Sequence, residues 1–327
     1  MASFSRRGLL GQSVAALALA PPLALMPSLA RAATGSHLNQ DPVTHPDAVE
    51  NIQGAADGQN HMTVQVWLNG KGPYRFVVDT GADRTVLADD VVKALGMSTG
   101  DEVIVQGIAR ALPAQSVRLA NLRVGPVVID DLDVPILPRA LLGGDGYLGL
   151  DVIDRQAVTF DFQNRELFIT HSERFTNYIH LNDALVRADG SRGRLTATNS
   201  SVDGVHAAAF IDSGAEYSIG NTQLFAQLAQ RGATYASTDT IQLFGVTGGI
   251  TGGRLTRVDR VKMGPVTFGN SVLIICDLPV FDIWGLADKP ALFIGMNFLR
   301  QTSAVTIDYG RKELRFRLGQ LRLASRA

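Results

Sequence analysis

The chain of 327 residues carries one sequence pattern twice, and this repeat limits the folds that it can adopt. Residues 76–87 run apolar residues into Asp-Thr-Gly-Ala-Asp, and residues 209–219 run apolar residues into Asp-Ser-Gly-Ala-Glu. An apolar run that ends in Asp-Thr/Ser-Gly is typical of a buried strand followed by a tight loop. We therefore expect two similar units, each presenting one aspartate, Asp79 and Asp212.

Further motifs recur in the same order, and the distance between the copies grows along the chain. The offset is 133 residues for the two Asp loops, then 139 for a Gly-Pro-Val motif, 146 for an apolar-Gly motif and 147 for an Asp that precedes an aromatic residue. Offsets that grow in this way indicate one duplicated unit with loop insertions, not a solenoid. The last three offsets are measured from Gly125 to Gly264, from Gly149 to Gly295 and from Asp161 to Asp308.

Alternating apolar residues predict a mostly β protein with few short helices. Residues 62–68 alternate, and Asn69-Gly70 provides a hairpin turn into the strand 74–78, which leads to Asp79. A short helix is predicted over 89–96, and its repeat over 221–231 before Gly232. Further strands are predicted over 103–105, 117–124, 127–129, 158–162 and 166–169.

The N-terminal segment has the features of an export signal. Arg6 and Arg7 precede an Ala- and Leu-rich stretch that ends in small residues near Ala32, which is typical of a twin-arginine signal peptide. The alternative is an uncleaved membrane anchor, but three prolines interrupt the stretch and favour cleavage. We expect a signal peptide over 1–32, a flexible linker over 33–58, and a periplasmic or secreted protein with no stable membrane insertion after cleavage.

Charge and residue composition argue against nucleic-acid binding, disulfide bonds and a zinc site. A formal net charge of -1 gives no reason to expect a nucleic-acid partner. The single cysteine, Cys276, cannot form a disulfide within the chain, and its apolar neighbours predict a buried small residue. The six histidines lack the His-x-x-x-His spacing of a zinc site, so we expect no metal and no cofactor.

Taken together, the paired motifs resemble those of the retropepsin and pepsin superfamily of aspartic proteases. Residues 79–82 and 212–215 match the active-site loops, and Leu148-Gly149 and Ile294-Gly295 belong to the later hydrophobic-hydrophobic-Gly motifs. The mature chain is most similar to bacterial periplasmic members that carry two retropepsin-like units in one polypeptide. This resemblance implies two similar β-barrel lobes with the active-site cleft between them. We place the lobes at 59–175 and 176–319, joined by a polar segment over 171–193, with a short tail over 320–327.

Two carboxylates held a few ångströms apart cannot both ionise cheaply, so they share one proton and titrate as a unit. The ionised partner can take a proton from a water molecule that attacks a peptide carbonyl, while the protonated partner donates to the carbonyl oxygen. We therefore expect Asp79 and Asp212 to be an interchangeable base and acid. The resemblance implies that the neighbouring hydroxyls brace the two loops and that the glycines permit close approach: Thr80, Gly81, Ser213 and Gly214.

The resemblance also implies a β-hairpin flap in each unit, over 103–119 and 241–255. The second flap is rich in glycine, which suits a mobile tip beside an extended peptide. A phosphate-binding loop is the alternative, but no Gly-Lys-Ser/Thr follows. The first tip is poor in glycine, so closure of both flaps stays an open question. The candidate flap and substrate-binding residues are Gly107, Ile108, Phe244, Gly245, Val246, Gly248 and Gly249.

Two acidic residues that follow the active-site loops, Asp83 and Glu216, are either subsite residues or solvated loop residues. Retropepsins commonly pair the first of these acids with an Arg directly after the later Gly, whereas this chain has Leu150 and Met296 there. We therefore expect any partner to come from elsewhere, such as Arg84 or the opposite lobe.

The sequence thus predicts an exported aspartic endopeptidase that acts as a monomer on extended polypeptides, including periplasmic segments of membrane proteins. The alternative is a peptide-binding module that has kept the cleft but lost turnover; the two retained aspartates favour the enzyme. Ala82 and Ala215 stand where pepsin-like enzymes usually have Ser or Thr. Because a donor to the charged form is missing there, we expect the pair to hold its shared proton to higher pH than in pepsin.

Overall fold

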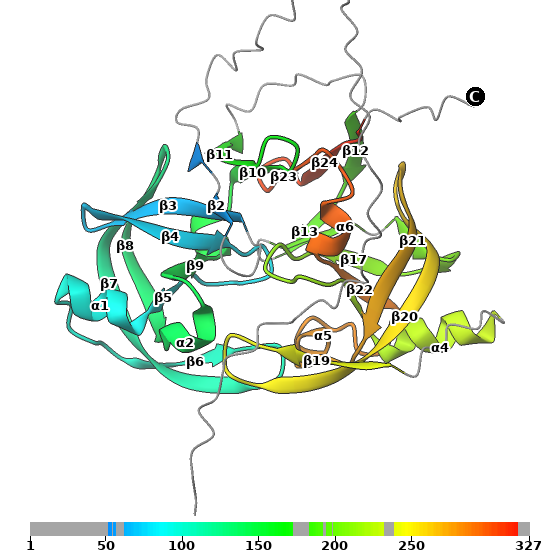
Figure 1. Cartoon of the computed structure of the whole chain (residues 1–327), viewed down its shortest axis with the longest axis horizontal. Helices are drawn as coiled ribbons and strands as arrows, with labels where there is room; N and C mark the ends of the chain where they lie inside the picture. Colours follow the sequence, from blue (N-terminus) through cyan, green and yellow to red (C-terminus); the bar gives the residue numbers. More distant parts are fainter. Residues whose placement is uncertain are drawn as a thin grey trace, which may run out of the picture.

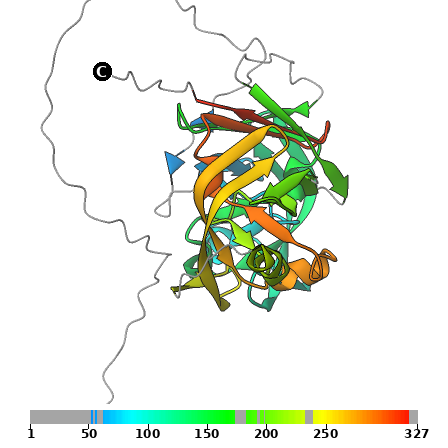
Figure 2. The same cartoon turned by 90° about the vertical axis from the view of Figure 1, so that its right-hand side faces the viewer.

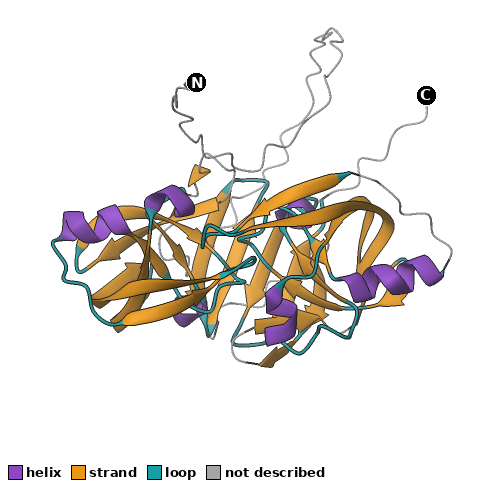
Figure 3. Ribbon diagram, turned by 90° about the horizontal axis from the view of Figure 1, so that it is seen from below, coloured by secondary structure: helices purple, strands orange, loops and turns teal. Residues whose placement is uncertain are grey.

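The computed structural model describes residues 52–53, 55–56, 62–172, 183–191, 194–197, 199–231 and 239–319. Strands form most of the molecule and the helices are short (Figure 3). The predicted signal peptide, most of the predicted linker and the tail over 320–327 lie outside these residues. Within the described ranges, no helix is both long and apolar enough to cross a membrane.

The first lobe is a closed barrel. Its elements are β2 (Ala55–Ala56), β3 (Met62–Leu68), β4 (Lys71–Val78), β5 (Val86–Ala88), α1 (Asp89–Leu95), β6 (Glu102–Gln106), β7 (Ala111–Val124), β8 (Val127–Leu137), α2 (Arg139–Leu142), β9 (Gly146–Leu148) and α3 (Leu150–Ile153). The strand order is β2-β3-β4-β9-β5-β8-β7-β6, and an additional pairing of β3 with β7 closes the ring. Apolar side chains that alternate along these strands fill the interior.

The second lobe repeats this order. Its elements are β13 (Asp189–Ser191), β14 (Arg194–Ala197), β15 (Ser200–Val202), β16 (Val205–His206), β17 (Ala208–Ile211), β18 (Ile219–Gly220), α4 (Thr222–Gln230), β19 (Thr240–Phe244), β20 (Ile250–Met263), β21 (Val266–Ile275), α5 (Pro279–Ile283), β22 (Ala291–Ile294) and α6 (Met296–Leu299). The parallel pair β17 and β22 corresponds to the parallel pair β4 and β9. Two short strands replace β3, because β14 pairs with β17 whereas β15 pairs with β20.

A third sheet joins the lobes. It is built from β1 (Ile52–Gln53), β10 (Gln156–Asp161), β11 (Glu166–His171), β12 (Asp183–Arg187), β23 (Ala304–Asp308) and β24 (Glu313–Arg317), in the order β1-β11-β10-β23-β24-β12. It lies across the top of the two lobes in Figure 1, and Figure 2 shows it from the side. At its centre β10 of the first unit pairs with β23 of the second, and the hydroxyl oxygens of Thr159 and Thr306 lie 2.8 Å apart.

The buried apolar residues form two clusters. The larger runs through both lobes and the joining sheet, and it includes Phe76, Phe160 and Phe316, each at most 1% exposed. The smaller lies in the second lobe around Phe210, Phe281 and Phe293. Burial of this apolar surface is the main source of stability in a chain without disulfides. Cys276 is buried, as its apolar neighbours predict.

The two hairpin turns confirm one local prediction. Asn69 and Gly70 have φ of 50° and 75°, the left-handed values that a two-residue turn between antiparallel strands requires. Asp203 and Gly204 repeat this turn in the second lobe, with φ of 45° and 82°. Both dipeptides suit the turn because Asn, Asp and Gly tolerate positive φ at low cost.

Three predicted boundaries need correction. The segment assigned to the linker contains β1 and β2, and the polar connection over 171–193 contains β12, which pairs with β24. Strand β8 continues to Leu137, well past the predicted end at 129. These strands lack a clear alternation of apolar residues, because they lie at sheet edges or carry solvent-facing acids, and backbone pairing needs no such pattern.

Candidate active site

Asp79 and Asp212 each follow directly after a strand, β4 and β17. The N–H of Asp79 donates to the carbonyl of Leu148 on β9 at 2.9 Å, and the N–H of Asp212 donates to the carbonyl of Ile294 on β22 at 3.0 Å. The later hydrophobic-hydrophobic-Gly motif of each unit therefore supports the Asp loop of the same unit. The parallel pairing carries both loops to the interface between the lobes.

Reciprocal hydrogen bonds between Thr80 and Ser213 join the two loops. The N–H of Thr80 donates to Ser213 Oγ at 3.1 Å, and the N–H of Ser213 donates to Thr80 Oγ1 at 2.9 Å. Each hydroxyl then donates to a carbonyl of the opposite lobe: Thr80 to Ile211 at 3.0 Å and Ser213 to Val78 at 2.7 Å. Both side chains are buried, so these bonds are shielded from water and fix the loops relative to each other.

Each carboxyl group accepts two N–H bonds from its own loop. The donors follow the Asp by two and three residues, at 2.9 and 3.2 Å from Asp79 Oδ1 and at 3.0 and 3.2 Å from Asp212 Oδ1. These bonds favour the charged form of a carboxyl group and fix its orientation. The four donors are Gly81, Ala82, Gly214 and Ala215.

The two glycines allow the carboxyl groups to converge. A Cβ atom on Gly81 would lie 2.8 Å from Cγ of Asp212, and one on Gly214 would lie 2.5 Å from Cγ of Asp79. Both distances are below normal contact between carbon atoms. Each loop therefore passes its glycine directly against the carboxyl group of the other lobe.

Burial raises the pKa of Asp212 from its ordinary value of 3.8 to about 8, and the negative charge of Asp79 acts in the same direction. A side-chain hydrogen bond between the two aspartates also raises this pKa, whereas the N–H donors Gly214 and Ala215 lower it. The pair therefore retains one proton near neutral pH. This shared proton removes the repulsion that two adjacent carboxylates would otherwise have.

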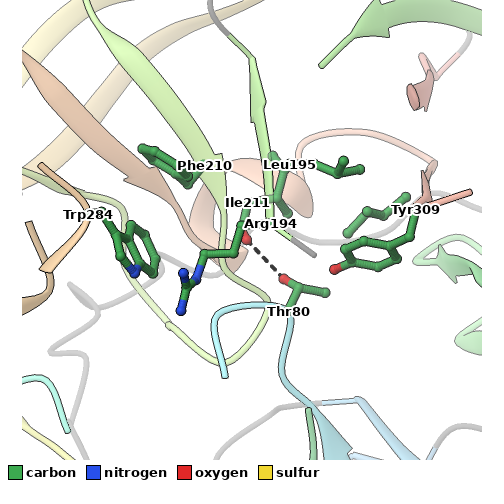
Figure 4. Close-up of a pocket in the computed structure, with 8 residues that line it drawn as sticks. Thr80, Arg194, Leu195, Phe210, Ile211, Trp284 and Tyr309 are labelled. Carbon is green, nitrogen blue, oxygen red and sulfur yellow. Dashed lines mark hydrogen bonds between the residues drawn. The ribbon is translucent and has the colours of Figure 1, made fainter. Parts of the chain in front are cut away.

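A buried phenol supports the Thr80 side of this arrangement. Thr80 and Tyr309 line one small pocket with Arg194 and Trp284, and the phenol oxygen of Tyr309 is directed towards Thr80 (Figure 4). Burial raises the pKa of Tyr309, with further contributions from the charges of Asp79 and Asp212. The phenol is therefore neutral and can hydrogen-bond with the side chain of Thr80.

The two acidic residues after the loops have different partners. Asp83 forms an ion pair with Arg194 of the opposite lobe, whose guanidinium also lies over the ring of Trp284 at 4.4 Å. The sequence offers Arg84 or the opposite lobe as sources of a partner, and for Asp83 the partner is the residue of the opposite lobe. The partner of Glu216 also comes from elsewhere than the position after the later Gly, but from its own lobe: Arg300 donates to its carboxylate at 2.9 and 3.2 Å. Helix α6 makes this possible, because it turns the chain back towards the loop just after Gly295.

The predicted flaps are the hairpins β6–β7 and β19–β20, and their tips contact each other. Arg110 Nε donates to the carbonyl of Thr247 at 2.9 Å, and the hydroxyl of Thr247 donates to the carbonyl of Arg110 at 2.9 Å. Five candidate residues take part in this contact: Gly107 packs against the Thr247 side chain, Gly245 against Ile108, Gly248 against Arg110, and Gly249 against Ala109. The tips of the two flaps therefore meet, although the first tip is poor in glycine.

The other two candidate flap residues are Val246 and Phe244. Val246 is partly buried against the larger cluster. The side chain of Phe244 is 46% exposed, on the face of β19 opposite to the buried Leu243.

A family model described as an aspartyl protease matches residues 64–152 and 198–298 of this chain. The chain belongs to this family. The two matched regions coincide with the two lobes and each contains one of the aspartates. The chain is also 31% identical over 133 residues to the UBA domain-containing protein Mud1 of Schizosaccharomyces pombe. That match covers 38% of this chain and 40% of Mud1, so the chain spans less than half of this relative.

Several residues of this aspartyl protease site are absent from the candidates drawn from the sequence. Arg194 and Trp284 come from regions without motifs, and Tyr309 follows the repeated Asp308; all three reach the site through tertiary packing. A second group has a detectable signal, because a hydroxyl residue follows each Asp by six positions. These residues are Thr85 and Ser218, which bond to side chains just after the later Gly of each unit.

Replacing Gly214 with Ala should destabilise the protein. The added methyl group would lie 2.5 Å from Cγ of Asp79, so a loop must shift, at a cost of about 1–3 kcal/mol in the free energy of unfolding. Gly269→Ala is the matched control, since the nearest atom to its added methyl is 3.9 Å away. Denaturant unfolding of both variants tests this, and equal midpoints would contradict the close approach of the two loops.

Proposed function

We propose that this protein is an exported aspartic endopeptidase that hydrolyses peptide bonds in extended polypeptide segments. The observation that carries the proposal is the convergence of Asp79 and Asp212 in a pair that retains one proton. Membership of the aspartyl protease family supports it. No metal or cofactor is needed for this chemistry, because the two carboxyl groups supply both the base and the acid.

The proposed reaction uses the asymmetry of the pair. The ionised carboxylate takes a proton from a water molecule bound between the two groups, and this water attacks the carbonyl carbon of the substrate. The protonated carboxyl group donates its proton to the carbonyl oxygen, which gives a neutral tetrahedral intermediate. The N–H donors of each loop hold the carboxyl oxygens in place, so the geometry does not have to reorganise during the transfer.

The flaps suit an extended substrate. A strand laid between the loops and the flap tips could pair with backbone groups of both, since glycine-rich tips bring the main chain close. The bonds between Arg110 and Thr247 must open for such a strand to enter. We propose that Asp83, beside the cleft and paired with Arg194, borders a subsite, and that Glu216 does so in the second lobe.

Further proposals concern where the protein acts and on which substrates. We propose that residues 1–32 direct export to the periplasm or the medium, and that periplasmic segments of membrane proteins are among the substrates. We also propose that one chain is a complete enzyme, because each unit contributes its own Asp loop and its own later Gly motif. Nucleic acid is not expected as a partner.

Asp79→Asn and Asp212→Asn should each abolish cleavage while the fold persists. Each change removes the shared proton chemistry, for which we expect a loss of roughly 10²–10⁴-fold in kcat. Cleavage of a proteome-derived peptide mixture, followed by mass spectrometry, measures this, with exposed Asp288→Asn as control. Full turnover by either variant would remove the pair from the mechanism, and binding of peptides without cleavage by the wild type would favour the peptide-binding module.

The pH profile should be bell-shaped, with its optimum in the mildly acidic to neutral range. The active form holds one proton, and the raised pKa of Asp212 means that this proton is lost only as the pH approaches about 8. Ala82→Ser should move the upper limb to lower pH, because a hydroxyl near Asp79 favours the charged form. A kcat/KM profile that peaks near about pH 2 and vanishes by about pH 5, as expected for pepsin-like values, would overturn this.

Specific activity should stay constant on dilution, since both halves of the site belong to one chain. Analytical ultracentrifugation across the same concentrations should give a species near the monomer mass of 35.0 kDa or that of the processed chain. A fall in specific activity that accompanies a dimer-to-monomer shift would show that a second chain completes the site.

A further inference from the structure

A second tether holds each Asp loop, six residues beyond the aspartate. Thr85 Oγ1 accepts a hydrogen bond from the N–H of Gly149 at 3.1 Å, and Ser218 Oγ accepts one from the N–H of Gly295 at 2.9 Å. Both hydroxyl residues are fully buried. Each hydroxyl therefore links the end of the Asp loop to the later Gly motif of the same unit.

The residue that accepts the hydrogen bond from the hydroxyl group differs between the lobes. In the first lobe Asp151 accepts from Thr85 Oγ1 at 2.7 Å and from the N–H of Thr85 at 2.8 and 3.0 Å. In the second lobe Asn297 Oδ1 accepts from Ser218 Oγ at 2.7 Å and from its N–H at 2.8 Å. The geometry is the same, but the first acceptor is a carboxyl group and the second is a neutral amide.

The amide of Asn297 has a further function that a carboxylate cannot perform. Its Nδ2 donates to the carbonyl of Val272 on β21 at 3.1 Å. The corresponding carbonyl in the first lobe belongs to Asp133 on β8, and Arg84 Nη2 donates to it at 2.6 Å. The strand registers establish this correspondence, since Leu87 pairs with Ile136 as Gly220 pairs with Ile275, and both carbonyls lie three residues earlier.

Arg84 also compensates the charge of Asp151. Burial raises the pKa of Asp151, whereas the bonds from Thr85 and the positive charge of Arg84 lower it. The other charged groups near this point are Asp133 on β8, whose carboxylate binds Arg118 at 2.7 Å, and Asp154 after α3. In the second lobe the position of Arg84 is occupied by Tyr217, and the amide there needs no counter-charge.

We propose that Arg84 and Asp151 act together as a charged positioning pair that holds the Asp79 loop as Asn297 alone holds the Asp212 loop. This proposal rests on the proposed function for its effect on catalysis. The pair does not touch the substrate; it acts through Thr85, whose backbone continues into the loop that carries Asp79. Either half without the other leaves a defect: a partly buried carboxylate without its counter-charge if Arg84 is lost, and a second donor that competes with Arg84 for the carbonyl of Asp133 if Asp151 becomes an amide.

The test transfers the arrangement of the second lobe into the first. Arg84→Tyr alone should lower kcat on the order of tenfold, with KM changed less, because a displaced loop misplaces Asp79. Arg84→Tyr with Asp151→Asn should recover most of this loss, since the amide supplies its own donor to the carbonyl of Asp133. Asn297→Asp is the mirror variant, and it should be impaired because no arginine stands at position 217.

Thermal unfolding as a function of pH provides a readout that does not need activity. The pKa of Asp151 is raised in the folded protein, so the folded protein binds the proton more tightly than the unfolded chain. The free energy of unfolding therefore falls as the pH rises above the ordinary pKa of an aspartate. Removing Arg84 should enlarge this loss, so the deficit of Arg84→Tyr should be small near about pH 4 and larger near about pH 7. Adding Asp151→Asn should abolish the pH dependence of the deficit.

The two readouts separate this proposal from the proposed function. If the wild type cleaves no peptide, the proposed function fails, but recovery of thermal stability in the double variant still supports the pair. If the losses of Arg84→Tyr and Asp151→Asn simply add in the double variant, at every pH and in both readouts, the pair does not act as a unit. An Arg84→Tyr deficit independent of pH would likewise overturn the proposal.

Discussion

The reciprocal bonds between Thr80 and Ser213 are the interaction on which the rest of this structure depends. Two carboxyl groups repel each other when both are charged, so the loops that carry them need a restraint that holds them in register. Four buried hydrogen bonds across the interface supply the restraint. The surrounding protein then keeps water away, which strengthens both the bonds and the coupling between the carboxyl groups.

Around this symmetric centre the two lobes differ in ways that the repeat does not require. The first barrel closes through one strand, β3, whereas the second uses β14 and β15. The ion pairs also differ, because Asp83 reaches across the interface to Arg194 and Glu216 stays with Arg300 in its own lobe. The same backbone pairing thus accommodates different side-chain contacts in the two lobes, since the strand ladders are formed by main-chain groups.

Much of this architecture could be predicted from the sequence, because repetition and turn chemistry are local signals. The doubled Asp motifs indicate two lobes, and Asn69-Gly70 indicates a hairpin, without knowledge of tertiary contacts. The partner of Glu216 and the buried phenol of Tyr309 could not be predicted in this way. Their positions depend on how α6 and β23 pack against segments that are distant in the sequence. No spacing between motifs indicates which of those segments come into contact. Strand β12 was missed for the same reason, since pairing at a sheet edge leaves little apolar pattern.

The central sheet, in which β10 of one unit pairs with β23 of the other, has a consequence for how such a protein can diverge. In an assembly of two identical chains, every substitution appears twice, so a change that helps one half and harms the other is lost. Here the two halves have separate sequences within one chain, although they fold as one structure. A substitution in one lobe therefore leaves the other unchanged, so the first lobe can use the carboxyl group of Asp151 where the second uses the neutral amide of Asn297.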